Sequence, residues 1–409
     1  MNLVNKWKLF VNNMKSNEKK LHYNLWKIYL YEIFASMFFS IPVIVLFWQH
    51  NGLSLTEVMV LQSIFAIITV ALEIPSGYFA DIYGRKRTLV FASTMGFIAI
   101  TTYSLGYNFY HFLIAEIFFA LSSSFTSGTV SALVYDTLQN IGKEKEYKKI
   151  WGNILSYGMV FLALSNILGG FIAKIDLRYT LYASIPFFAL MIPLAFLTQE
   201  PARHKPIFKK GYTEGLLKII KTTLLRNKKL RWIIIYSGII YAFNQSALWL
   251  YQPYFKLSGL DFAYFGIVFA SFQVVSAFAS KYAHKIEKML GQKYSLAMLI
   301  FLVAGSYFLM SNFIFLFSFS FCFIQQFVRG FKNTVVTDYI NQLTDSSMRA
   351  TVLSVESFIG RLLYASIIPL FGWIADVYTL EQALAVMGAT TLTSGIIILL
   401  IFKRDKVLQ

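Results

Sequence analysis

The sequence places one charged stretch between two long apolar runs, near residues 55–80 and 86–107: Gly77-Tyr-Phe-Ala-Asp81-Ile-Tyr-Gly84-Arg85-Lys86-Arg87. An apolar run of about 20 residues is what a helix needs to cross a hydrocarbon core of about 30 Å. The stretch therefore predicts a short basic turn between two membrane spans. Gly77 would let two helices approach closely, Gly84 would form the turn, and Asp81 could pair with the bases.

The composition of the whole chain supports a membrane protein. Of 409 residues, 57% are hydrophobic and only 14% are charged, and the mean hydropathy is +0.57. Soluble domains average about 25% charged residues, so this chain has too little polar surface to cover itself in water. The apolar runs are continuous rather than alternating, which excludes a membrane β-barrel. We expect an all-α membrane protein.

The apolar runs predict twelve transmembrane helices. Polar breaks that contain glycine, such as 50–54, 256–261 and 291–293, mark several of the turns. The predicted spans lie near 25–48, 55–80, 86–107, 110–138, 149–173, 178–198, 231–255, 262–284, 293–311, 313–341, 350–377 and 380–402.

The basic residues predict the orientation. An even number of spans places both termini on one side, and the connections on that side together with the terminal segments hold 30 Lys and Arg residues, against 3 on the other. By the positive-inside rule both termini are cytoplasmic, which predicts a multi-pass protein of the inner or plasma membrane, in contact with its lipids. The net charge of +17 is then mainly a topology signal and not a sign of nucleic-acid binding. The first 22 residues lack the features of a signal peptide.

The longest polar stretch divides the chain into two halves. We expect an N-terminal six-helix half (1–198), a cytoplasmic linker (199–230) and a C-terminal six-helix half (231–409). Within the linker, residues 211–225 place apolar side chains on one helical face, which predicts an amphipathic helix on the membrane surface. A solvated linker is the alternative.

The charged stretch matches the pattern G-x3-D-x2-G-R-[RK]-[RK] completely. Together with the twelve spans and the basic central linker, it resembles the signature loop of the major facilitator superfamily, and the resemblance covers nearly the whole chain. In that family the loop acts as a lock on the outward-facing state that must break for alternating access. The resemblance assigns this lock to Gly77, Asp81, Gly84, Arg85, Lys86 and Arg87. A turn that only satisfied the positive-inside rule would not need the acid or both glycines.

Three further segments bear on the resemblance. Residues 280–293 look like a degenerate second copy of the loop without its acid, and Asp136 and Asp338 occupy corresponding ends of spans four and ten as candidate gating residues. Residues 131–138 look like a bacterial subgroup that is often drug-efflux-like. The span-five glycine motif of antiporters is incomplete: the glycines at 152, 169 and 170 match, whereas Phe161, Ser165 and Asn166 depart from it. The resemblance to antiporters in span five is therefore partial.

Charged residues inside spans are functional candidates because they are costly in a membrane. For proton coupling the candidates are Glu32 and Glu116, and also Glu73, which shares a helix face with Gly77 and Asp81 and could equally belong to the lock. Asp376 lies near an outer span end and is expected to be merely interfacial. The further gating candidates in the second half are Glu356 and Arg361.

Polar side chains at helical spacing in spans seven and ten are candidates for substrate binding. They are Asn244, Gln245 and Trp249 in span seven and Gln325, Arg329 and Lys332 in span ten. Core packing is an equal alternative for the amides. The acids of the first half and the bases of the second could pair across the halves and close a gate; otherwise the bases would hold an anionic or zwitterionic substrate.

These features predict a secondary transporter that moves a small amphipathic molecule by alternating access, with proton-coupled efflux favoured. The alternatives are proton-coupled uptake of a nutrient, such as a siderophore, peptide or organic anion, and a non-transporting receptor or scaffold. An enzyme is not expected, because the sequence shows no catalytic grouping. The single cysteine and five scattered histidines show no metal-ligand spacing. We expect no cofactor and a monomer.

Overall fold

The computed structural model describes residues 21–202, 227–346, 348–405 and 407, and the regular structure of these residues is helical. A helix covers residues 21–35. The further elements are α2 (Ile44–His50), α3 (Leu55–Tyr83), α4 (Arg85–Leu105), α5 (Phe109–Asn140), η1 (Glu144–Glu146), α6 (Tyr147–Ala173), α7 (Leu177–Leu197), α9 (Lys228–Leu257), α10 (Phe262–Asn312), η2 (Leu316–Phe321), α11 (Cys322–Gln342), α12 (Arg349–Val377) and α13 (Leu380–Arg404). The predicted amphipathic helix at 211–225 lies outside the described residues.

Local sequence signals set the helix ends. Ser54 and Glu57 form a capping box at the start of α3. The Asp176 side chain caps α7 by accepting a hydrogen bond from a backbone N–H of its first turn. Gly84 separates α3 from α4 with a φ of 107°, and Gly291 reverses the chain inside α10 with a φ of 71°. Positive φ angles of this kind favour glycine.

Nine helices of the described chain are long and apolar enough to cross a membrane. Three further predicted spans account for the difference between these nine helices and the predicted twelve spans. The reversal at Gly291 divides α10 into two predicted spans, and α11 with its lower hydropathy corresponds to span ten. The first predicted span is not one continuous helix: it is broken at 36–43, between helix 21–35 and α2.

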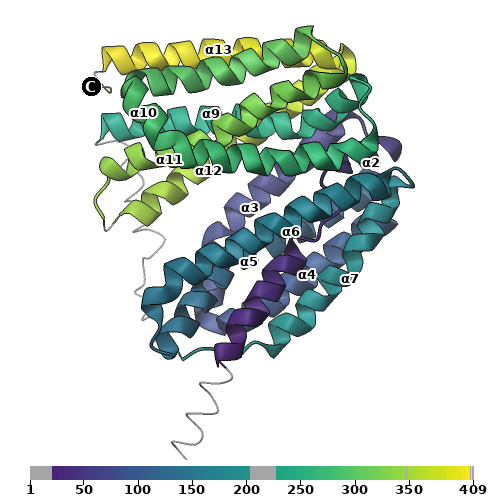
Figure 1. Ribbon diagram of the computed structural model, residues 1–409, viewed down its shortest axis with the longest axis vertical. Coiled ribbons are helices and arrows are strands. Elements are labelled where there is room, and N and C mark those ends of the chain that lie inside the picture. Colours follow the sequence, from purple (N-terminus) through teal and green to yellow (C-terminus); the bar gives the residue numbers. More distant parts are fainter. Residues whose placement is uncertain (1–20, 203–226, 347, 406, 408–409) are drawn as a thin grey trace, which may run out of the picture.

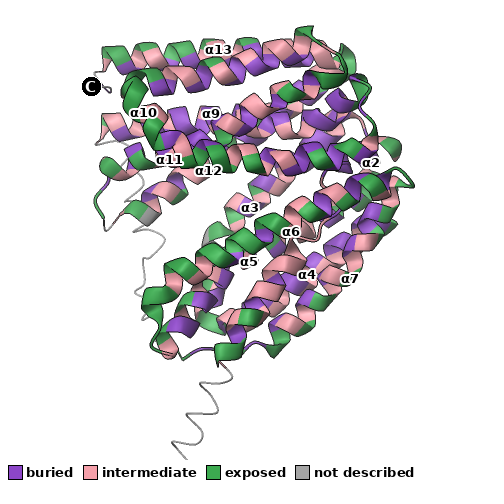
Figure 2. Cartoon of the chain, in the orientation of Figure 1, coloured by how far each residue is buried: buried purple, intermediate pink, exposed green. Residues whose placement is uncertain are grey.

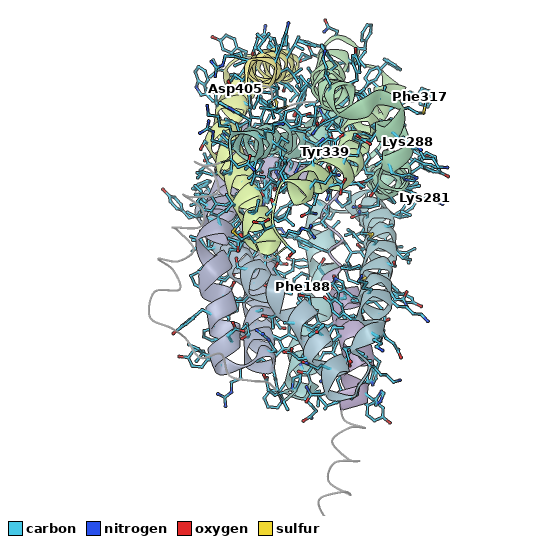
Figure 3. The ribbon with its side chains drawn as sticks, turned by 90° about the vertical axis from the view of Figure 1, so that its left-hand side faces the viewer. Phe188, Lys281, Lys288, Phe317, Tyr339 and Asp405 are labelled. Atoms are coloured by element: carbon cyan, nitrogen blue, oxygen red, sulfur yellow. The ribbon has the colours of Figure 1, made fainter. Side chains whose placement is uncertain are left out.

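The buried apolar side chains form two clusters. One is built mainly from residues 28–195 and the other mainly from residues 230–407. We call the corresponding helices the N-bundle and the C-bundle, and Figure 1 shows them as two groups, α2–α7 below and α9–α13 above. Phe188 lies inside the N-bundle, where its ring packs against Phe38 and Phe119 (Figure 3). On the outside of the C-bundle, Lys281 and Lys288 point away from the helices (Figure 3).

The two bundles pack together at one end only. We call the end where the described chain begins and finishes the terminal end, and the opposite one the far end. At the far end α3 packs on α12 and α6 on α10, and Gly170 and Gly266 let the backbones of α6 and α10 touch where a Cβ would meet the neighbouring main chain. Figures 1 and 2 show the bundles converging near α2, where buried residues gather.

The same four helices are exposed toward the terminal end. Exposed positions include Tyr78 on α3, Tyr157 on α6, Phe278 on α10 and Phe358 on α12, and the bundles diverge toward this side (Figure 1). The described residues therefore form two helical bundles that are packed together at the far end and apart at the terminal end.

Candidate functional site

A cavity of about 210 Å³ lies between α9 and α11 in the C-bundle. Its lining joins four of the six predicted substrate-binding residues, and the full set is Ile240, Tyr241, Asn244, Gln245, Val328, Arg329, Lys332 and Asn333. α9 contributes one wall and α11 the other, because residues three to four positions apart share a helix face. The spacing seen in the sequence therefore corresponds to one surface in the structure.

Lys332 is the buried cation of this cavity and it already has a partner. Its Nζ lies 2.8 Å from a carboxylate oxygen of Glu356 on α12 and 5.6 Å from the ring centre of Tyr241. Glu356 also accepts a short hydrogen bond from the hydroxyl of Ser237. Glu356 and Arg361, two of the predicted gating residues of the second half, do not form an ion pair among the described residues, because the acid pairs with Lys332.

Arg329 is exposed at the cavity wall. Among the described residues it forms no ion pair, whereas Arg361 lies near it, beside the Tyr241 hydroxyl. Predicted pairing across the halves is also not seen in the described part of the chain, because neither Glu32 nor Glu116 reaches these bases. The cavity thus carries an excess of positive charge.

Two predicted substrate contacts lie elsewhere. Gln325 is buried, with its amide bonded to Ser306 (2.6 Å) and to Asn244 (2.7 Å), so it supports the cavity wall from behind. Trp249 lies between the bundles: its indole donates to the Tyr364 hydroxyl at 2.6 Å and its ring lies 6.0 Å from that of Trp48. Both side chains act as structural partners in this state.

Glu116 is buried in the N-bundle near the interface between the bundles. It accepts hydrogen bonds from Tyr103 (2.5 Å) and Gln62 (2.6 Å), and only 5% of the residue is exposed. Tyr364 of the C-bundle lies within its electrostatic reach. A buried carboxyl held by neutral donors is a group whose charge state depends on its surroundings.

The other two N-bundle acids differ from Glu116. The Glu32 side chain packs against Gly158 on α6, within 3.2 Å of where a Cβ would stand, and is partly buried. Glu73 is exposed on α3, and its carboxylate forms no ion pair with the described residues. Neither position is joined to the C-bundle.

Part of the predicted lock forms a network inside the N-bundle, whereas the close helix approach expected at Gly77 is not seen, because a Cβ there would meet no atom of a neighbouring described helix within 4 Å. Arg85 lies 2.7 Å from Asp81 and 3.4 Å from Asp136 on α5, which joins the loop to one of the predicted gating residues. Lys86 stacks over the ring of Phe196 at 5.0 Å. The remaining candidate, Asp338, bonds to Gln342 in its own helix at 2.7 Å.

Glu200 contacts the lock but was not among the residues predicted from the sequence. Its carboxylate accepts from the backbone N–H groups of Arg85 (2.9 Å) and Lys86 (2.8 Å), so it caps the positive N-terminus of α4. The signal was available in principle, because Glu200 directly follows span six at the same membrane face as the lock. Its pairing with residues 115 positions away required the fold.

Asp376, expected from the sequence to be merely interfacial, forms a contact between the bundles. It is not merely interfacial: its carboxylate accepts from the backbone N–H of Leu55 (2.9 Å) and of Thr56 (2.7 Å) and from the Thr56 hydroxyl (2.5 Å). An acid of the C-bundle therefore caps the first turn of a helix in the N-bundle. This contact fastens the far end.

Two further polar contacts cross the far end. Gln252 on α9 accepts from the backbone N–H of Val45 (2.7 Å) and donates to the carbonyl of Ile41 (2.9 Å), so it holds the broken part of the first span. Lys174 lies 3.5 Å from Asp261. The N–H of Ala263 lowers the pKa of Asp261, as does Lys174, and keeps its carboxylate charged.

Comparisons with known proteins agree with this arrangement. The family model described as "Major Facilitator Superfamily" matches residues 29–367. The chain belongs to the Major Facilitator Superfamily. It is 23% identical over 376 residues to the uncharacterised MFS-type transporter YxaM of Bacillus subtilis, which covers 85% of this chain and 88% of that one.

Two more similarities place the chain within the superfamily. It is 22% identical over 395 residues to the quinolone resistance protein NorA of Staphylococcus aureus strain MRSA252, with 92% of this chain and 95% of NorA covered. The crystal structure of the nucleoside transporter NupG superposes with a TM-score of 0.77 at 14% identity, with 94% of this chain and 99% of that chain covered. The chain is thus a multi-pass membrane transporter with a Major Facilitator Superfamily fold.

Proposed function

We propose that this protein exports a small amphipathic molecule by proton-coupled alternating access. The observation that carries the proposal is the one-sided packing of the bundles: they are joined at the far end, apart at the terminal end, and bear a polar cavity on the C-bundle. This is one of the two states that an alternating-access transporter needs. The halves 1–198 and 231–409 would be the moving bodies, in a monomer.

The basic residues support a cytoplasmic location of the open side. The first and last described helices and the basic turns at 85–87 and 281–293 lie at the terminal end, so the positive-inside rule supports a cytoplasmic location of this end in an inner or plasma membrane. The described state would then be inward-facing and ready to take a molecule from the cytoplasm. The name of NorA, a quinolone resistance protein, supports export.

Uptake is the alternative direction. The structural neighbour NupG is a nucleoside transporter, but at 14% identity the likeness supports the fold alone. An inward-facing state occurs in either direction of transport. The direction must therefore be measured, with a quinolone as the export probe and a nucleoside as the uptake probe.

For proton coupling we propose Glu116 first and Glu32 second. Glu116 sits at the interface between the bundles, and its two neutral donors, Tyr103 and Gln62, come from different helices of the N-bundle. Opening of the far end would change its access to water, and with it the affinity of the carboxylate for a proton. Glu73 is exposed and unpaired among the described residues, which fits it less well.

The lock residues would act in the opposite state. Asp81, Arg85 and Asp136 pair within one bundle in the described state, with the C-bundle apart from them at this end. Closing the terminal end would bring α12 toward α3 and let the same charges contact the C-bundle. This exchange of partners is what the proposal assigns to the loop.

The experiment is transport by purified protein in proteoliposomes with an imposed pH gradient. Norfloxacin and uridine serve as the two probes, and Glu57→Gln, in the first turn of α3, is the matched control for Glu116→Gln and Glu32→Gln. We expect Glu116→Gln to abolish gradient-driven accumulation while substrate exchange without a gradient continues. Full response of both single variants and of the double variant would place the coupling elsewhere, and no exchange of any molecule by wild-type protein would remove the proposed function.

A further inference from the structure

We infer that the α9–α11 cavity binds the anionic group of the substrate, with Arg329 as its main contact and Glu356 as a built-in competitor. The inference rests on the proposed transport function and names the substrate class of the same site. It follows from the size of the cavity, from the unequal pairing of its two bases, and from the free amides beside them.

The size of the cavity limits what it can hold. At about 210 Å³ it is smaller than the roughly 300–1,000 Å³ of pockets that enclose drug-sized ligands. It has room for a charged head with one ring or a short chain. The remainder of a larger amphipathic molecule would extend from the cavity into the space between the bundles.

The two bases of the cavity are not equivalent. Lys332 is buried and neutralised by Glu356 at 2.8 Å. Arg329 is exposed at the wall and forms no ion pair among the described residues, and Arg361 adds a further positive charge beside Tyr241. A ligand carboxylate or phosphate would complete this arrangement, because a guanidinium can bind either group with two parallel hydrogen bonds.

Two amide side chains that could bind a ligand line the same cavity as Arg329. Gln245 and Asn333 line the same cavity, and neither side chain forms a hydrogen bond within the described residues. Asn244, by contrast, donates to the backbone and side-chain oxygens of Gln325 and so is held in place. Free amide N–H groups next to a guanidinium are donors that an anion can use.

Glu356 makes the site selective. It occupies Lys332 and is itself held by the hydroxyl of Ser237, so the second base is available only when a ligand displaces the acid. A cationic molecule would find no favourable electrostatic interaction with a wall that carries Arg329 and the Lys332–Glu356 pair. An anion that reaches Lys332 must compete with a fixed internal carboxylate, so removal of that carboxylate should tighten binding.

The test uses matched pairs of small molecules that differ in one charge. Purified protein in uncharged detergent at pH 7 is given up to 10 mM benzoate or benzamide, and nicotinate or nicotinamide, and its Tm and calorimetric Kd are measured. We expect the acids to raise the Tm of the wild type and the amides to leave it unchanged. Failure of both acids to stabilise the wild type more than their amides would overturn the inference.

Three variants assign the effect to residues. Arg329→Gln should weaken acid binding about tenfold or more, since it removes a charged hydrogen-bonding partner, while Arg329→Lys should retain part of it. Glu356→Gln should bind the acids several-fold more tightly, because Lys332 is released. Unchanged acid binding in Arg329→Gln, or weaker binding in Glu356→Gln, would overturn the inference. The Tm of each variant without ligand shows whether it is folded.

Phospholipid headgroups carry the same anionic chemistry, and they are separated by repeating the measurement with added phosphatidylglycerol. Competition between lipid and acid is consistent with the inference, whereas stabilisation by the lipid alone overturns it. The outcome is independent of the transport assay. A protein that binds the acids but transports nothing retains the anion site and loses the proposed function, and one that exports norfloxacin without binding the acids retains the proposed function and loses the anion site.

Discussion

Removal of the Asp376 carboxylate should open the far end of the protein. In the described state this side chain accepts three hydrogen bonds from the first turn of α3, at 2.9, 2.7 and 2.5 Å. Every one of them joins the two bundles, and none can persist when the far end opens. Asp376→Ala would therefore destabilise the closed far end relative to the open one.

The size of the effect follows from the contacts. Hydrogen bonds to charged groups contribute about 1.5–3 kcal/mol when buried, but Asp376 is exposed, and an exposed anion at a helix N-terminus contributes about 0.3–1 kcal/mol. We take about 1–2 kcal/mol for the whole contact. Since about 1.4 kcal/mol corresponds to a factor of ten, the ratio of closed to open far ends should fall about five- to thirtyfold. Asp376→Asn keeps one acceptor oxygen and should give a smaller shift.

Spin labels at Ile175→Cys and Leu257→Cys can report the opening. Both positions lie at the far end, in different bundles, and are exposed by 77% and 46%. The single native cysteine, Cys322, is buried, so labelling is confined to the introduced residues. Double electron–electron resonance measures the distance between the two labels. The population with the longer distance should grow from the parent to Asp376→Asn to Asp376→Ala.

Asp176→Asn is the matched control. Asp176 also caps a helix at the far end, but it bonds to Arg178 in its own bundle at 2.7 Å. Its substitution should lower stability without changing the distance distribution. Identical distance distributions for Asp376→Ala and the parent would refute the proposal that the Asp376 contact holds the far end closed. An equal shift of the distance distribution in the Asp176→Asn control would show that the loss of any helix cap loosens the far end.

Three more predictions concern other parts of the chain. Asp81→Asn should slow transport several-fold with only a small change in Tm, because the i,i+4 ion pair between Asp81 and the partly buried Arg85 is of a kind that contributes about 0.3–0.5 kcal/mol to folding; wild-type exchange rates would remove the lock from the mechanism. Gly266→Ala should force the bundles apart, at a cost of about 1–3 kcal/mol, because its Cβ would meet the backbone of Asn166, whereas Gly305→Ala, with open space around it, should leave the Tm unchanged; equal Tm values would contradict this close approach. The pKa of Asp261 is lowered in the folded state, so its stabilising contacts are fully present above the unfolded-state pKa of about 3.8 and are lost only as the pH falls through the lower folded-state pKa. The difference in Tm between wild type and Asp261→Asn should therefore be constant from pH 7 to 5. A loss of that difference above pH 5 would contradict the assignment.

Much of the architecture follows from the amino-acid order alone. Apolar runs of about 20 residues make helices in a membrane because each backbone N–H and C=O must be paired within its own segment. The loop from Gly77 to Arg87, with its complete spacing, was sufficient to indicate the superfamily that the comparisons show. Gly291 marked the reversal within α10. These are local or periodic properties, which a sequence displays directly.

Helical spacing also predicted part of the candidate cavity. Asn244 and Gln245 on one helix and Arg329 and Lys332 on another share the α9–α11 cavity. Helical spacing could not distinguish the residues that line the cavity from those that pack elsewhere. Gln325 and Trp249 fit the same spacing but contact other partners. The rotation of a helix in a bundle depends on all of its neighbours.

Only the tertiary structure decided which charges pair. Glu356 bonds to Lys332 and not to Arg361, Glu200 caps the loop 115 positions before it, and Asp376 joins residues more than 300 positions away. Each pairing needs two segments whose separation is set by how the bundles pack. The conformational state is also outside the reach of the sequence, since under the proposed alternating access the same chain would hold both bundles closed at one end and then at the other. That balance depends on the difference between two sets of long-range contacts, and a linear order of residues specifies neither set by itself.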